Sequence, residues 1–172
     1  MRAKFLAACA MALFVTPAAA QAPGLEQQWI RCTNANETVS YEVARDACTE
    51  IISSGRESQN NVAIASFNRA NAQVNLRNPG PAVADYSTAI TLGVADSEVY
   101  YGRGIAHYDL QQYDNALADY NEALRQNPNY GEAYGNRGNV YQYGRNEFDT
   151  AIADYTRALS IRENDIDLHN RA

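Results

Sequence analysis

The sequence contains little of what catalysis, metal binding or nucleic-acid binding requires. Its 172 residues include two histidines, three cysteines and one tryptophan, and the single lysine is Lys4. Lys and Arg together number 14 against 20 Asp and Glu, which gives a net charge of −6 at pH 7. An acidic chain without basic clusters is a poor candidate for binding nucleic acid or anionic lipid. We therefore expect no nucleic-acid partner.

Candidate nucleophiles, general bases and metal ligands are scattered along the chain. His107 stands within an apolar pattern and His169 lies near the C-terminus, so neither has a second His or a Cys arranged beside it. The segment "YGRGIAHY" has neither the glycine spacing of a phosphate-binding loop nor a strand before it. We predict that the protein is not an enzyme and uses no cofactor or metal.

No apolar run reaches the roughly 20 residues that a transmembrane helix needs. The N-terminal segment "MRAKFLAACAMALFVTPAAAQA" has two basic residues, an apolar run and a small-residue tract. This layout is typical of a secretory signal peptide, residues 1–20, cleaved after Ala20. We expect a periplasmic or secreted chain with no stable membrane insertion, whose net charge falls from −6 to −8 with the loss of Arg2 and Lys4. An alternative is lipid anchoring at Cys9 through "LAAC", although the apolar run continues past that cysteine.

The sequence does contain one nine-residue phrase three times. "AVADYSTAI" begins at Ala82, "ALADYNEAL" at Ala116 and "AIADYTRAL" at Ala151, which are intervals of 34 and 35 residues. Apolar residues fall at the first, second, fifth, eighth and ninth places, and this is one stripe of an α-helix. A second helical segment precedes each copy, with an arginine 13 or 14 residues before the phrase: Arg69, Arg103 and Arg137. The pattern predicts three helix pairs.

The repeated residues resemble the tetratricopeptide repeat (TPR), a pair of helices with small and aromatic residues at fixed positions. Residues 97–130 carry Tyr100, Gly104, His107, Ala116, Tyr120, Ala123 and Pro128 of its pattern. Residues 131–165 carry Tyr134, Gly138, Tyr141, Ala151, Tyr155 and Ala158, with Glu163 in place of the proline. Residues 63–96 fit more loosely, with Ala70, Ala82, Tyr86 and Ala89 present and Ser66 and Gln73 at aromatic positions.

The resemblance implies an all-α fold, a right-handed α-solenoid of stacked antiparallel helix pairs. Each pair buries its apolar stripe against the next, which explains why the phrase recurs. We place the extra residue of the third unit in the turn "GRNEF", where it leaves the helices in register. Residues 166–172 are expected to begin a further helix, of which only about two turns fit.

On the same repeat frame, residues 21–62 form a fourth, degenerate unit. Arg31, Cys32, Ala44, Cys48 and Ile51 take positions 7, 8, 20, 24 and 27, so the two cysteines should face each other. Because they are the only cysteines left after removal of the leader, we predict a disulfide between them, which an exported protein permits. The alternative is two buried free thiols. A redox site is disfavoured because the spacing is unlike C-x-x-C.

Charged residues also recur at fixed positions. Arg occupies position 7 at Arg31, Arg69, Arg103 and Arg137, and Arg171 could continue the series. Asp occupies position 23 at Asp85, Asp119 and Asp154. We predict a ladder of guanidinium–carboxylate bridges that ties neighbouring helices. The alternative is a row of solvated charges that contributes little to stability.

The resemblance assigns a peptide-binding role to positions 2, 5, 9 and 12 of the first helices, which line the concave groove of the family. The predicted peptide-binding groove comprises Phe67, Asn71, Tyr101, Ile105, Tyr108, Asn139 and Gln142. Tyr and Phe offer large contact area, and Asn can hydrogen-bond an extended peptide backbone. Alternatively these side chains pack against neighbouring helices or stand in water. No position of this stripe is basic, so capture of a C-terminal carboxylate is not predicted.

Two functions follow. The first is an exported adaptor that binds a protein or peptide partner in its groove. The second is a structural unit that self-associates into a homo-oligomer, because the last repeat leaves apolar surface at its open end.

Overall fold

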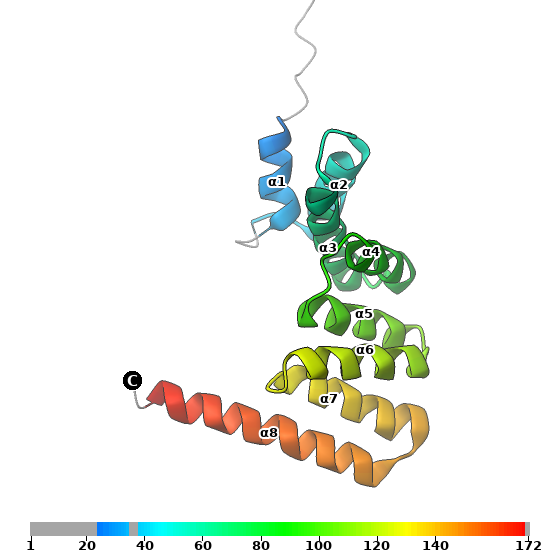
Figure 1. The fold of residues 1–172 in the computed structure, drawn as a ribbon, viewed down its shortest axis with the longest axis vertical. Helices are drawn as coiled ribbons and strands as arrows, with labels where there is room; N and C mark the ends of the chain where they lie inside the picture. The colour runs from blue at the N-terminus through cyan, green and yellow to red at the C-terminus, as the bar shows by residue number, and fades with distance from the viewer. Residues whose placement is uncertain (1–23, 35–37, 171–172) are drawn as a thin grey trace, which may run out of the picture.

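The structure, a computed structural model, describes residues 24–34 and 38–170 (Figure 1). The expected leader, with Cys9, and Arg171 lie outside these residues. All elements of the described part are helical: α1 (Leu25–Thr33), α2 (Tyr41–Ser53), α3 (Gln59–Asn75), α4 (Pro79–Thr91), α5 (Ser97–Asp109), α6 (Tyr113–Gln126), α7 (Gly131–Asn139), the π-helical turn η1 (Val140–Arg145) and α8 (Phe148–Asn170). None of these helices is both long and apolar enough to cross a bilayer.

The helices form pairs that stack one on the next (Figure 1). Within each pair the two helices pack against each other, α1 with α2, α3 with α4, α5 with α6 and α7 with α8. Between pairs, α2 packs on α3, α4 on α5 and α6 on α7, so each second helix contacts the first helix of the following pair. This arrangement confirms the predicted all-α helical repeat fold.

Local sequence signals fix where several helices begin. Ser58 caps α3 by accepting a hydrogen bond from the backbone N–H of Asn61, 3.2 Å away. Asp96 caps α5 by accepting from the N–H groups of Glu98 and Val99 at 3.0 and 3.1 Å. These side chains satisfy amides that have no partner inside the helix. Pro79 begins α4, where the missing N–H of proline costs nothing.

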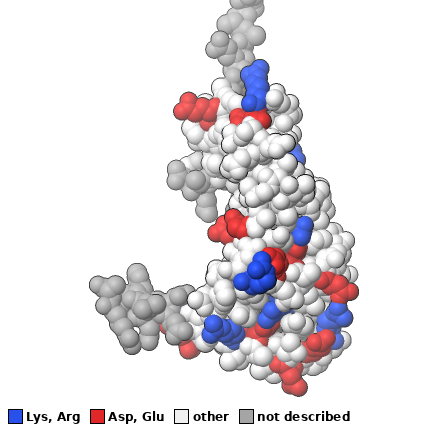
Figure 2. Space-filling model, viewed as in Figure 1, with Lys and Arg blue, Asp and Glu red and all other residues white. Residues whose placement is uncertain are grey.

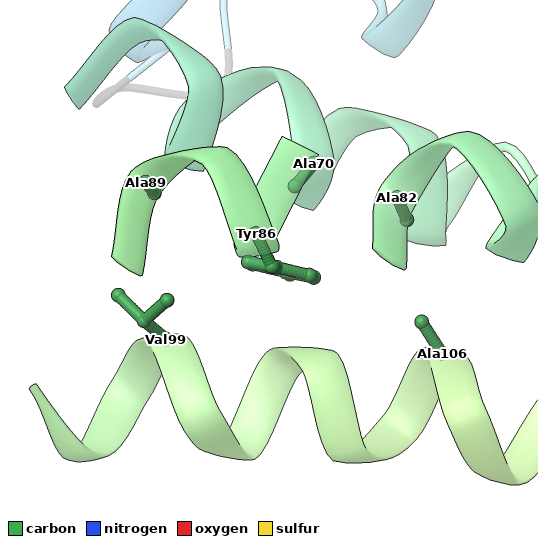
Figure 3. Close-up of a cluster of buried hydrophobic side chains, with 6 residues drawn as sticks. All are labelled: Ala70, Ala82, Tyr86, Ala89, Val99 and Ala106. Carbon is green, nitrogen blue, oxygen red and sulfur yellow. The ribbon is translucent and has the colours of Figure 1, made fainter. Parts of the chain in front are cut away.

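The core is built from small residues packed around a tyrosine in each repeat. Figure 3 shows Tyr86 of α4 lying between Ala70 of α3 and the facing helix α5, which carries Val99 and Ala106. Tyr86 and Tyr120 are both only 1% exposed. The alanine side chains leave space for the large ring, and the stacked pairs thereby bury a continuous apolar seam.

Glycine permits the closest helix approach in two repeats. A Cβ atom on Gly104 would lie 2.7 Å from a ring carbon of Tyr120, and one on Gly138 would lie 2.8 Å from the corresponding carbon of Tyr155. Real Cβ atoms do not approach carbon that closely, so a larger residue would push the ring or the helix away. The first repeat uses Ala70 at this position and accommodates its Cβ.

The extra residue of the third repeat lies in a helix and not in the turn where we expected it. The residue that reverses the chain direction after each first helix has a positive φ: Arg77 (57°), Gln111 (59°) and Asn146 (58°). One residue separates each of them from the second helix, so all three turns have the same length. The insertion therefore precedes Asn146, in η1, because a π-helical turn accommodates one more residue than an α-helical turn.

The expectation of a separate partial helix at residues 166–172 is also wrong where the structure describes them. Helix α8 continues without a break to Asn170 and projects beyond the stack (Figure 1). The second repeat ends its helix before Pro128, whereas the third repeat has Glu163 at that position. Without a proline or glycine between 160 and 170, no residue ends the helix.

The N-terminal pair is closed by a disulfide between Cys32 of α1 and Cys48 of α2. Both cysteines are 0–1% exposed and form a cluster with Ala47, Ile51 and Ala65. The predicted pairing is present in the structure, and the free-thiol alternative is not. Because Ala65 belongs to α3, the disulfide lies in the interface between the first pair and the second.

Candidate peptide-binding groove

A ladder of ion pairs fixes the orientation of the first helix of each repeat. Two guanidinium nitrogens of Arg103 donate to the two carboxylate oxygens of Asp119 at 2.7 and 2.9 Å. Arg69 binds Asp85 in the same way at 2.6 and 2.8 Å. Arg137 of the third repeat binds Asp154 at 2.7 and 2.8 Å. Bidentate pairing is the strongest geometry available to these groups.

The same arginines also reach the preceding helix pair. The third guanidinium nitrogen of each donates to a polar side chain on the preceding second helix, at 2.6 to 3.2 Å: Thr49, Ser87 and Asn121 for Arg69, Arg103 and Arg137 respectively. The ladder therefore ties neighbouring helices, as predicted, and the solvated-charge alternative is wrong. On the face shown in Figure 2, acidic and basic side chains lie near one another over the lower part of the molecule.

A pocket of about 370 Å³ opens between the first helices of two adjacent repeats. Its lining comes from α3, α4, α5 and the loop before α7: Phe67, Asn71, Val74, Asn75, Tyr86, Glu98, Tyr101, Gly102, Ile105 and Tyr130. We call this surface the central groove. Phe67, Asn71, Tyr101 and Ile105 were predicted as groove residues, and the fold brings these four together at one pocket.

Two tyrosines form one wall of the central groove. The rings of Tyr101 and Tyr130 have their centroids 4.7 Å apart and are tilted by 41°. Tyr101 also accepts a hydrogen bond from Asn136 Nδ2 at 3.0 Å, which fixes its hydroxyl. Both rings are only half-buried, so their remaining surface is available to a ligand.

The electrostatic environment of this wall is negative. Burial raises the pKa of Tyr101, and the neighbouring carboxylate of Glu132 raises it further. Burial also raises the pKa of Tyr130 well above its ordinary value, with smaller contributions from Tyr101 and from the carboxylates of Glu98 and Glu132. A negative charge on either phenol is disfavoured mainly because the ring is partly buried, and the nearby carboxylates add to this effect.

The three predicted amide residues lie against core tyrosines. Asn71 Oδ1 accepts from the Tyr86 hydroxyl at 2.5 Å. The Tyr155 hydroxyl lies 2.8 Å from both Asn139 Oδ1 and Gln142 Oε1, and its single proton can be donated to either oxygen. These amides thus accept from phenols of the second helices, and of the two phenols only that of Tyr86 lines the central groove. Asn139 and Gln142 do not line the central groove.

Tyr108 also lies outside the central groove. Its ring packs against Tyr113 with a centroid separation of 5.9 Å, at the end of α5. It belongs to a separate aromatic cluster with Tyr101, Ile105 and Leu117 around buried Tyr120. Tyr108 therefore continues the apolar surface next to the central groove without lining the pocket itself.

His107 is enclosed by its own repeat. Its Nδ1 lies 2.6 Å from Gln112 Oε1, and its Nε2 lies 3.8 Å from Asp119 Oδ2. In the repeat before, Gln73 occupies the same position and donates to Asp85 Oδ2 at 2.8 Å. The His107 ring thus lies beside the Asp119 carboxylate of the ion-pair ladder. No group of three His, Cys, Asp or Glu residues in the described ranges is arranged to hold a metal ion.

Family comparisons agree with this repeat geometry. Family models described as "Tetratricopeptide repeat" match residues 97–130 and residues 131–165. The chain is a tetratricopeptide repeat protein. Among curated relatives of this TPR protein, human tetratricopeptide repeat protein 6 is 33% identical over 109 residues. That match covers 63% of this chain and 21% of the length of the human protein.

Solved TPR structures share its fold. The crystal structure of MamA superposes with a TM-score of 0.71 at 19% identity, covering 84% of this chain and 81% of MamA. The second TPR of Spaghetti (RPAP3), bound to the HSP90 peptide SRMEEVD, superposes with a TM-score of 0.54 at 22% identity. This superposition covers 58% of the present chain and 85% of the Spaghetti chain.

Sequence reasoning on this TPR protein missed Tyr130 as a groove residue and Asn136 as the hydrogen-bond partner of Tyr101. Tyr130 stands in the loop before α7, outside the helical stripe on which the groove prediction depended. Its contact with Tyr101 depends on the path of that loop. The sequence does show an aromatic residue directly before the first helix of the third repeat. Helix periodicity cannot say which way the side chain of such a loop residue points.

Proposed function

We propose that this TPR protein binds an extended segment of another polypeptide in the central groove. The observation that carries the proposal is the half-buried aromatic wall of Tyr101 and Tyr130 beside an open pocket of about 370 Å³. Such a wall offers apolar contact area at a low cost in side-chain entropy. The ion-pair ladder holds the two first helices that form it, so little further ordering is needed on binding.

The related TPR of Spaghetti supports a peptide ligand, because its structure contains one. Exposed polar groups along the groove suit the backbone of an extended chain. Asn75 and Glu98 are exposed at its rim, and Asn71 retains an amide group beside the pocket. Hydrogen bonds from these groups would hold the peptide backbone, while the aromatic wall takes a side chain.

Selection from a display library of random 12-residue peptides tests the proposal. The protein should enrich peptides whose affinity, measured by fluorescence anisotropy, falls at least tenfold in Tyr101→Ala and in Phe67→Ala. Tyr41→Ala, which removes a 41%-exposed tyrosine from α2, is the matched control and should leave affinity unchanged. Circular dichroism checks that each variant is folded.

An enriched peptide that binds both groove variants as tightly as the wild type would place binding elsewhere. A library without any enriched peptide would contradict peptide binding altogether.

The second candidate function is self-association through the open end of the stack. Ile152 of α8 is 61% exposed and Leu159 is 47% exposed. Leu117 and Leu124 hold the equivalent positions in the preceding repeat. There Leu117 packs into a core cluster and Leu124 is only 6% exposed, because the following helix covers both. A second copy of the chain would cover this face of α8.

Light scattering on dilution tests self-association. If it occurs, the wild type should have a concentration-dependent mass at micromolar concentration, and Ile152→Glu should be monomeric throughout. Val43→Glu, at a 41%-exposed position on α2, serves as the control and should keep the wild-type behaviour. A wild type that is monomeric at every concentration rejects this function.

We also propose that the chain is exported, with cleavage after Ala20. A buried disulfide favours an oxidising compartment, since such bonds are rare where thiols are kept reduced. Intact-mass measurement of the protein from its own cells should give a chain that begins at Gln21 and lacks free thiols. A chain that retains Met1, or one that carries a lipid on Cys9, would overturn this assignment.

A further inference from the structure

We infer that the central groove selects a segment with an Arg or Lys side chain, which lies against the Tyr101–Tyr130 wall. This inference rests on the proposed peptide-binding function and names the chemistry of its ligand. The argument comes from charge complementarity between the groove and its occupant.

The groove combines aromatic faces with carboxylates and has no basic lining residue. Glu98 lines the pocket, and no Arg or Lys is among the residues that form it. Glu132 follows directly on the loop that carries Tyr130 and acts on both phenols of the wall. Each carboxylate is exposed, and within the described ranges neither forms an ion pair.

The nearby arginines cannot neutralise an acidic ligand. Arg69, Arg103 and Arg137 each direct two guanidinium nitrogens at an aspartate and the third at the preceding helix. An acidic peptide would therefore meet Glu98 and Glu132 without a cation to pair with. Like charges brought together at an interface oppose binding.

A basic side chain satisfies both features of the groove. Its cationic head can lie over a tyrosine face, where the ring quadrupole attracts it, and its methylene stem can cover the rest of the ring. The carboxylate of Glu98, which lines the pocket, then lies beside the cation, and Glu132 adds negative charge from the first turn of α7 outside the pocket lining. A guanidinium uses the two together best because it is planar and donates several hydrogen bonds.

Anisotropy titrations with a matched pair of peptides test the inference. One is the best-binding Arg-containing peptide from the library, and the other has citrulline, a neutral isostere, in place of each Arg. The wild type should bind the Arg peptide about tenfold more tightly. Glu98→Gln/Glu132→Gln should lose that preference, because it removes the carboxylates and with them the advantage of the Arg peptide over the citrulline peptide.

Two controls separate local from overall charge. Glu26→Gln/Glu42→Gln removes two exposed carboxylates at the same first-turn position of α1 and α2, and it should keep the preference. Asn75→Arg introduces a competing cation at the exposed rim of the groove and should weaken the Arg peptide about tenfold. Thr88→Arg, which places the same cation at an exposed position of α4 outside the pocket lining, should not.

The outcomes distinguish the two proposals. Equal affinity for the two peptides, with binding still lost in Tyr101→Ala, overturns the basic preference and leaves the peptide groove intact. A library enriched in acidic or uncharged peptides has the same meaning. Absence of any enriched peptide overturns the peptide groove, and the basic preference with it.

Discussion

At the scale of single residues, each repeat depends on a tyrosine from its second helix that lies on a small residue of its first. Tyr120 rests on Gly104 and Tyr155 on Gly138, at separations that leave no space for a Cβ. Asn71 and Asn139 of the first helices accept hydrogen bonds from Tyr86 and Tyr155, and Asn71 and Tyr86 also line the central groove. The core and the groove thus share the same side chains.

Gly104→Ala should destabilise the protein by about 1 to 3 kcal/mol, because the new methyl group overlaps the Tyr120 ring. Gly135→Ala is the matched control, since nothing lies within 4 Å of its Cβ direction in α7. It should raise stability by up to about 1 kcal/mol through helix propensity. Urea unfolding measures both, and equal effects would refute the close-packing argument.

Asp119→Asn should lower the free energy of unfolding by about 2 kcal/mol. The Asp119 side chain is 6% exposed, so its loss leaves the Arg103 guanidinium partly buried without its counter-charge. Asp114→Asn breaks the exposed pair with Arg145 and should cost less than about 0.5 kcal/mol. Similar urea midpoints for the two variants would show that the ladder contributes no more than a surface pair.

At the scale of helices and helix pairs, the two ends of the stack differ. The N-terminal pair has a covalent bond between α1 and α2, buried against Ala65 of the next pair. In the part of the chain that the structure describes, no helix packs on α8 after the C-terminal pair, and Ile152 is exposed where its counterparts are covered. A repeat protein needs a modified terminal unit at each end, because internal units expose an apolar face.

Cys32→Ser/Cys48→Ser should destabilise the N-terminal pair by about 3 kcal/mol, the loop-entropy value for a separation of 16 residues. Because neighbouring repeats couple only through their shared interface, hydrogen exchange should speed up in α1 and α2 far more than in α5 and α6. Uniform acceleration along the chain would mean that the stack unfolds as one unit. Wild-type protein in reductant provides the comparison.

At the scale of the whole molecule, buried tyrosines make stability depend on pH in the alkaline range. Burial raises the pKa values of Tyr86 and Tyr120 well above the ordinary value of 10.0. A raised folded-state pKa contributes stability that is complete below pH 10 and is lost as the pH rises above it. The native fold therefore requires these phenols to stay protonated.

Stability should be constant from pH 8 to pH 9.5 and should fall by roughly 2 to 3 kcal/mol by pH 11, because unfolding then releases the phenolic protons of Tyr86 and Tyr120, and half-buried Tyr130 adds a smaller loss. Urea unfolding at each pH measures this, and absorbance at 295 nm follows tyrosine ionisation. Tyr120→Phe should reduce the fall by about half. Tyr41→Phe, at an exposed position, should leave it unchanged, and an equal reduction in both would disprove the assignment.

The helical periodicity and the recurring small and aromatic residues were enough to predict the all-α repeat fold, the ion-pair ladder and the disulfide. All three depend on spacing within rigid helices: Arg103 and Asp119 meet because their helix positions are fixed once the pair packs. Cys32 and Cys48 meet for the same reason.

The path of loops and the position of the insertion were decided only in three dimensions. Periodicity gives no direction to Tyr130, which reaches Tyr101 through the course of the loop before α7. The third repeat absorbs its extra residue in the π-helical turn Val140–Arg145, because packing fixes both the preceding helix and the length of the turn. The central groove includes such a loop residue, so the sequence determined the scaffold and tertiary packing completed the site.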